Sequence, residues 1–189
     1  MRQTVLLIML TCALAAAGTW AATAGGSPAP DPPTTSTATA DTNVPEPSPV
    51  QVQRVIDRYR KTTWHWQRVM GRRLQLTLRR PPADVHERMS TWQRVAKYTV
   101  RLAAHPPHMY AWSCIHRFEG AWTDSGAPYY GGLQMDLGFQ RRYGAYLLAR
   151  KGTADHWTPL EQMWAAERAL RAGRGFYPWP NTARYCGLL

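Results

Sequence analysis

Apolar residues recur at helical spacing in the middle of the chain. From Gln51 to about Arg73 this spacing predicts an amphipathic helix, or a helix with a break near Thr62-Thr63. A second helical run is expected over 83–104, between Pro81-Pro82 and Pro106-Pro107. The residues on these faces are Val52, Val55, Ile56, Tyr59, Trp66, Val69 and Met70, then Val85, Met89, Trp92, Ala96, Thr99 and either Leu102 or Ala103. We expect the two helices to form an antiparallel pair.

The segment after this pair has shorter helical signals separated by Gly and Pro. A short helix is expected over 109–119, then a Gly-rich loop up to Pro128, and another helix over 137–150. Thr158-Pro159-Leu160-Glu161 has the form of a capping box with Pro at the first helical position, and Gly173 is expected to end the helix that follows. The predicted fold class is mainly α with little or no β-structure. A small domain over 109–189 is preceded by a helical pair, 51–108, that packs on it.

The N-terminus has the pattern of an export signal. A positive start at Arg2 is followed by an apolar run and by small residues, so residues 1–24 are interpreted as a signal peptide. An uncleaved anchor and a lipoprotein signal through Cys12 are weaker readings, since the run is short and Cys12 lies inside it. Residues 25–50 are rich in Pro, Thr, Ser and Ala and are expected to be a disordered linker. No later segment has 18 uninterrupted apolar residues, which excludes a multi-span membrane protein and predicts no membrane span after signal removal.

The net charge of the expected folded part narrows the class of binding partner. Residues 51–189 hold 22 basic and 9 acidic residues, a net of +13, which favours an anionic partner such as a cell-wall polymer or nucleic acid. The basic residues match no nucleic-acid-binding motif, so solvated helix faces remain the alternative and no specific nucleic acid is expected.

The cysteine content predicts a protein with one disulfide bond. After signal removal only Cys114 and Cys186 remain, and in an exported chain they most simply form one disulfide, with a pair of buried free thiols as the alternative. The six histidines show no paired ligand spacing, so neither a metal nor another cofactor is expected.

Glu119 is the sharpest candidate for chemistry. Apolar and aromatic residues surround it in sequence, including Ile115, Phe118 and Trp122. Such surroundings make the charged carboxylate less favourable and keep a proton available, as a general acid requires. The alternative is a solvated residue at a helix end. Gly131-Gly132 further along would permit tight backbone geometry or the close approach of a ligand.

An ordered set of motifs links these features. Trp112 and Cys114 precede Glu119-Gly120, and Trp122, Tyr129-Tyr130-Gly131-Gly132-Leu133-Gln134, Glu161-Gln162, Trp179-Pro180 and Cys186-Gly187-Leu188 follow. Over about the last 80 residues the chain thereby resembles the resuscitation-promoting factor domain of actinobacteria. This transglycosylase-like domain is a small member of the lysozyme-like superfamily and acts on peptidoglycan.

The resemblance implies roles for individual residues. Glu119 takes the place of the catalytic glutamate, Tyr130 and Gln134 line the glycan groove, Asp136 takes the polar position after the Gly-Gly-Leu-Gln block, and Cys114 with Cys186 takes that of the disulfide. Trp122, Tyr129 and Trp179 are candidates for stacking on sugars, with fold packing as the alternative. Three departures stand out: Cys114 lies five positions before Glu119, residues 135–140 lack the hydroxyl and Trp that are common in the family, and the run 174–178 is longer.

The expected function is that of an exported peptidoglycan-cleaving glycosidase, secreted or associated with the cell wall. Glu119 would act alone in a lytic transglycosylase, whereas a muramidase would need Asp124 or Asp136 as a second carboxylate. The two outcomes are nearly even, with a slight preference for the transglycosylase. A catalytically inactive cell-wall binding or signalling module and a general polyanion binder are the competing hypotheses.

Overall fold

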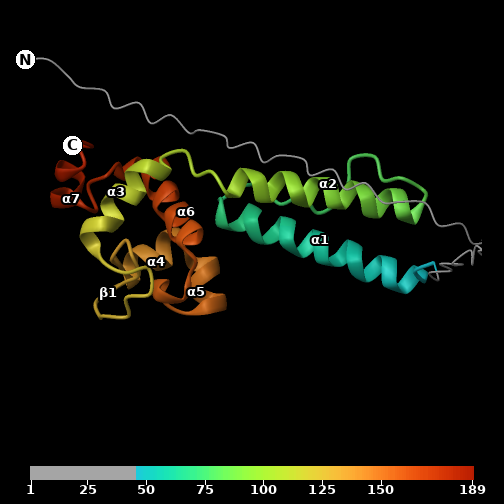
Figure 1. The fold of residues 1–189 in the computed structure, drawn as a ribbon, viewed down its shortest axis with the longest axis horizontal. Coiled ribbons are helices and arrows are strands. Elements are labelled where there is room, and N and C mark those ends of the chain that lie inside the picture. Colours follow the sequence, from blue (N-terminus) through green and yellow to red (C-terminus); the bar gives the residue numbers. More distant parts are fainter. Residues whose placement is uncertain (1–45) are drawn as a thin grey trace, which may run out of the picture. The chain divides into compact units, whose positions relative to one another are not determined.

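A computed structural model describes residues 46–189 as one compact unit, mainly helical as the sequence predicts (Figure 1). The signal peptide and all but the end of the linker lie outside the described residues. The elements are α1 Pro49–Val69, α2 Val85–Ala103, α3 Met109–Glu119, β1 Tyr129–Tyr130, β2 Met135–Asp136, α4 Leu137–Tyr143, α5 Ala145–Lys151, the 3-10 turn η1 Ala154–His156, α6 Pro159–Ala169, the π turn η2 Leu170–Arg174 and α7 Pro180–Tyr185.

The helical pair α1 and α2 is antiparallel and packed along its length (Figure 1). Helix α1 begins at Pro49, inside the predicted linker, because Ser48 and Gln51 form a capping box around this proline. Nothing breaks α1 near Thr63, whose buried hydroxyl donates to the carbonyl of Tyr59 at 2.9 Å within the helix. The alternative of a broken helix was therefore wrong.

A single core joins the helical pair to the C-terminal helices. Val69, Met70 and Ala103 from the ends of the pair are buried in the same cluster as Trp112 and Trp164. The indole N–H of Trp164 donates to the carbonyl of Ala103 at 2.8 Å. A smaller cluster around Val52, Ile56 and Trp92 fills the far part of the pair.

The helix predicted over 137–150 is two helices, α4 and α5, which meet at Gly144. A Cβ atom at Gly144 would overlap the ring of Trp157, whose indole N–H is held by the carbonyl of Gly152 at 2.8 Å. The capping box at Thr158 is present as predicted, with Pro159 at the first position of α6. Helix α6 continues into the π turn η2, in which Gly173 takes a positive φ of 84°.

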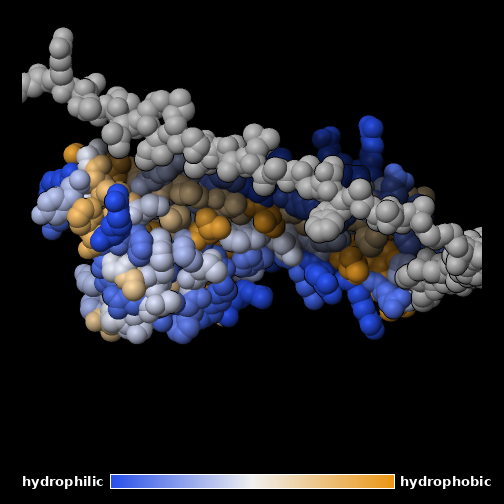
Figure 2. All heavy atoms as spheres, viewed as in Figure 1, coloured by the Kyte–Doolittle hydropathy of each residue, from blue (hydrophilic) through white to orange (hydrophobic). Residues whose placement is uncertain are grey.

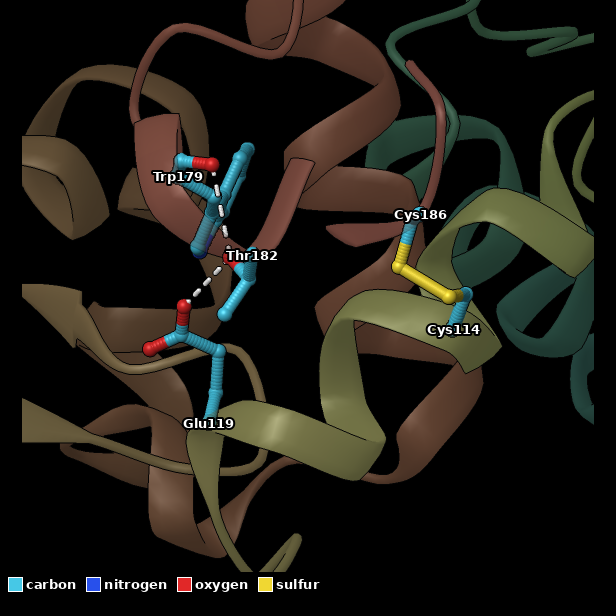
Figure 3. The surroundings of a disulfide bond; sticks show 5 residues. All are labelled: Cys114, Glu119, Trp179, Thr182 and Cys186. Atoms are coloured by element: carbon cyan, nitrogen blue, oxygen red, sulfur yellow. Dashed lines mark hydrogen bonds between the residues drawn. A yellow bond between two sulfur atoms is a disulfide. The ribbon is translucent and has the colours of Figure 1, made fainter. Parts of the chain in front are cut away.

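Strands β1 and β2 form a short antiparallel hairpin in which Tyr129 pairs with Asp136 and Tyr130 with Met135. The structure contains the predicted disulfide: Cys114 of α3 is bonded to Cys186, which follows α7 (Figure 3). None of the helices within residues 46–189 combines the length and apolar character needed to cross a bilayer. On the face drawn in Figure 2, hydrophilic side chains protrude along the helical pair.

Candidate active-site groove

Glu119 is the last residue of α3 and points toward α7 (Figure 3). The hydroxyl of Thr182 donates to Glu119 Oε1 at 2.7 Å and lies 3.3 Å from the carbonyl of Trp179. Thr182 is 9% exposed, so its hydroxyl is held in place by packing. The Cys114–Cys186 disulfide links α3, which carries Glu119, to the end of α7, which carries Thr182.

The surroundings of Glu119 are less apolar than its sequence neighbours predicted. Ile115 is fully buried in the core, and Phe118 is 57% exposed, near Tyr185. Glu119 itself is half-buried and has a hydroxyl partner. The prediction overlooked Thr182 because adjacency in sequence does not show which side chains of a later helix meet the end of α3.

A small cavity of about 230 Å³ opens beside the Glu119 carboxyl group. Tyr129, Gln134 and Trp179 contribute to its wall, with Pro178, Pro180 and Asn181. Gln134 is fixed by its own contacts, because its side-chain amide donates to Asp124 Oδ2 at 2.8 Å and to the carbonyl of Gly131 at 3.0 Å. Its positive φ of 47° is the cost of this tight turn. Sequence-predicted residues from three separate segments, the end of α3, the hairpin and the start of α7, therefore meet at this cavity.

A second cavity of about 620 Å³ continues from the first. The two share Tyr129, Pro178 and Pro180 as lining residues, and we call them together the groove. Tyr129 is 49% exposed at the junction, where an aromatic ring is available to a ligand. Arg142 and Arg174 line the far part, and within residues 46–189 neither forms an ion pair with a carboxylate. The groove therefore has the Glu119 carboxyl group in its first cavity, and in its second cavity these two arginines together with the Asp136 carboxylate.

The two candidate second carboxylates have structural contacts of their own. Asp124 Oδ1 accepts from the backbone N–H of Gly126 at 3.0 Å, and Oδ2 accepts from Gln134. Asp136 caps α4 by accepting from the N–H of Phe139 at 2.6 Å and lines only the second cavity. Neither aspartate lines the cavity of Glu119.

Three aromatic candidates occupy different places. Trp179 lines the Glu119 cavity but is only 4% exposed, and its indole N–H donates to the carbonyl of Leu133 at 2.6 Å. Trp122 stacks on His116 with ring centroids 3.9 Å apart and packs against the core. Tyr130 also packs against the core and lines neither cavity, since successive strand residues face opposite sides. The neighbouring Tyr129 is the one that reaches the groove.

The two glycines of the hairpin make room for protein side chains. A Cβ at Gly131 would lie 2.5 Å from Gln162 Oε1, and one at Gly132 would lie 2.6 Å from His116 Nδ1. Gly131 also has a positive φ of 74°. The positive φ fits the expected tight backbone geometry at Gly131, and at both glycines the nearest atoms belong to protein side chains.

Neither a metal site within residues 46–189 nor a similar known protein adds to the description of the groove. In the part of the chain that the structure describes, no three His, Cys, Asp or Glu side chains are grouped to hold a metal ion. The chain matches no family model, no curated protein and no solved structure, so its chemistry rests on the groove described above.

Proposed function

We propose that this protein is an exported glycosidase that cleaves the glycan strand of peptidoglycan between N-acetylmuramic acid and N-acetylglucosamine, by lytic transglycosylase chemistry. The observation that carries the proposal is the lone carboxyl group in its cavity: within residues 46–189, Glu119 is the only acid that lines it. Asp124 is held by the backbone of Gly126 and the side chain of Gln134, Asp136 caps α4, and neither aspartate lines this cavity. A mechanism that needs one carboxyl group fits this arrangement better than one that needs two.

Glu119 would serve first as acid and then as base. Its proton passes to the bridging glycosidic oxygen as that bond breaks and the muramic acid ring develops oxocarbenium character. The Glu119 carboxylate then accepts the proton of the 6-hydroxyl of the same sugar, whose oxygen bonds to C1. The products are a 1,6-anhydro sugar and a strand with a new hydroxyl end, and Glu119 regains its proton. Thr182 would position the carboxyl group by donating to Oε1 while the other oxygen handles the proton.

The two arginines of the groove suit the carboxylates of an anionic glycan. Muramic acid carries a lactyl group whose carboxyl is either free or joined by an amide bond to a peptide with carboxylates of its own, whereas chitin-like glycans are neutral. Arg142 and Arg174 line the second cavity without a carboxylate partner in the described residues. Guanidinium groups bind carboxylates with paired hydrogen bonds. Tyr129 lines both the second cavity and the cavity of Glu119, where its ring would stack on a sugar face.

The test is digestion of purified peptidoglycan, with mass spectrometry of the released fragments. The wild-type protein should release muropeptides with 1,6-anhydro ends, and Glu119→Gln should release none, because the amide has no proton to donate. Glu87→Gln is the matched control, since it makes the same change at an exposed carboxylate of α2.

Other outcomes would redirect the proposal. Reducing ends in place of anhydro ends would indicate a muramidase. Equal release by wild type and Glu119→Gln would remove Glu119 from the mechanism. If a folded wild-type protein binds peptidoglycan and releases nothing, the catalytically inactive binding module becomes the better explanation.

A further inference from the structure

A separate cavity of about 700 Å³ lies between α1, α5 and the start of α6, and we call it the α1–α5 cavity. It shares no lining residue with the groove. Its wall is rich in cations and aromatic rings: Lys61, Trp64, His65, Arg68, Tyr146 and Arg150. The helical pair and the C-terminal helices both contribute, so the cavity exists only where these parts pack together.

The single acid of the α1–α5 cavity, Glu161, is already neutralised by the protein. Its side chain is 2% exposed and accepts from Lys151 Nζ at 2.7 Å, while His65 Nε2 lies 3.1 Å from its other oxygen. The backbone N–H and the hydroxyl of Thr158 donate to it as well, at 2.7 and 3.0 Å. Lys151 and His65 are therefore engaged with Glu161 and do not supply free charge to the cavity.

Three other cations remain without a counterion. Within residues 46–189, no carboxylate pairs with Lys61, Arg68 or Arg150, and all three side chains are exposed. The guanidinium groups of Arg68 and Arg150 both lie over the ring of Tyr146, at 5.4 and 5.6 Å from its centroid. Cation–π attraction of this kind offsets part of the repulsion between two like charges on one ring. The arrangement gathers positive charge at one place.

The ring that organises these cations is itself fixed. The hydroxyl of Tyr146 lies 3.2 Å from His65 Nδ1, and the other nitrogen of His65 faces Glu161. A chain of contacts thus runs from the buried carboxylate through His65 to Tyr146. Sites that are organised before the ligand arrives lose less entropy on binding.

We propose that the α1–α5 cavity binds the phosphate group of a sugar phosphate or polyol phosphate, with Arg68 and Arg150 as its main ligands and Lys61 as a third cation. A phosphate monoester carries close to two negative charges and three acceptor oxygens. It therefore matches three cations better than a carboxylate, which carries one negative charge. The planar guanidinium group matches phosphate with paired hydrogen bonds. Trp64 lines the same cavity and offers a ring to the carbon-bearing part of the ligand.

Isothermal titration calorimetry of the full chain at 150 mM salt tests this proposal, with glucose 6-phosphate as the probe. Saturable binding is expected, with no binding of glucose and weaker binding of glucuronate. The double variant Arg68→Gln with Arg150→Gln should lose roughly tenfold in affinity or more, since each arginine contributes a charge-assisted hydrogen bond. A short poly(glycerol phosphate) serves as a second probe. The internal phosphates of this polymer are diesters with one negative charge each, so tighter binding of glucose 6-phosphate supports the proposed monoester site. Tighter binding of the polymer would overturn it in favour of general polyanion affinity.

The matched control is Arg54→Gln with Arg141→Gln, which removes the same charge from exposed arginines that line neither the groove nor the α1–α5 cavity. Its affinity should stay within about twofold of wild type, as distant surface charges are screened at this salt. An equal loss of affinity in both double variants would overturn the site in favour of general polyanion affinity. The same conclusion would follow if single-stranded RNA bound more tightly than the phosphate probes and both double variants weakened its binding equally. Equal binding of glucose, or no binding of either phosphate probe, would also overturn it. Glu119→Gln should bind as wild type does, so failure of the proposed function leaves this test intact.

Discussion

Acid should destabilise the fold through Glu161. Burial raises the pKa of this carboxyl group, but hydrogen bonds from His65, Lys151 and the backbone of Thr158 outweigh burial and lower the pKa from 4.5 to about 2. Each pH unit between the unfolded and folded values is worth about 1.4 kcal/mol, so the gap corresponds to about 3 kcal/mol of stability.

The sign follows from which state binds the proton more tightly. Between pH 4.5 and about 2 the unfolded chain holds a proton on Glu161 and the folded chain does not. The contribution of Glu161 to the free energy of unfolding therefore has its full value above pH 4.5 and is lost as the pH falls toward 2. At pH 7, Glu161→Gln should cost a few kcal/mol, because Lys151 and His65 lose their anionic partner.

Urea unfolding of wild type and Glu161→Gln at pH 7, 5, 4 and 3 measures this effect. The difference in unfolding free energy between the two proteins should shrink steadily from pH 5 to pH 3. Glu87→Gln, at an exposed position of α2, should follow the wild type at every pH. If wild type and Glu161→Gln lose stability in parallel over this range, the buried ion pairs do not control the acid response and the reasoning fails.

Three further outcomes follow from the structure. Replacing Cys114 and Cys186 by serine should lower the free energy of unfolding by about 4 kcal/mol, since the disulfide spans 72 positions, and urea titration with and without reductant measures this. Gly144→Ala should cost about 1–3 kcal/mol, because the new methyl group meets the ring of Trp157; an unchanged thermal midpoint would contradict this packing. Thr182→Val should lower the rate of muropeptide release roughly tenfold without unfolding the protein, since the candidate acid loses its hydrogen bond, whereas Thr182→Ser should restore the rate; no rescue would indicate a packing role only.

Helices with long apolar stripes and clear caps could be predicted closely from the sequence. The predicted segment 109–119 coincides with α3, and the capping box at Thr158 opens α6 as expected. The break at Gly144 was missed because it depends on Trp157, which approaches the backbone only in the folded chain. The start of α1 was missed because Ser48-Pro49 has the composition of the preceding linker as well as that of a helix cap.

The site was predictable where a residue type has few alternatives. Two cysteines in the described residues can pair in only one way, and the structure contains that disulfide. Glu119, Gln134 and Tyr129, which the sequence motif contains, line one cavity, whereas Tyr130 of the same motif does not. Thr182, Arg142 and Arg174 were not singled out, because ordinary threonines and arginines carry no signal until folding brings them to the same groove.

The shared core also determines how freely the C-terminal region can be exchanged between proteins. Val69, Met70 and Ala103 fill the same interior as Trp164, and the indole of Trp164 donates to a carbonyl of the helical pair. A fragment beginning at residue 109 would leave that buried donor without its acceptor, at a cost of about 1–3 kcal/mol, and would expose the apolar surface that the pair covers. Evolutionary recombination and protein engineering must therefore transfer α1 and α2 together with the C-terminal helices, because the helical pair is part of the hydrophobic interior that supports the groove.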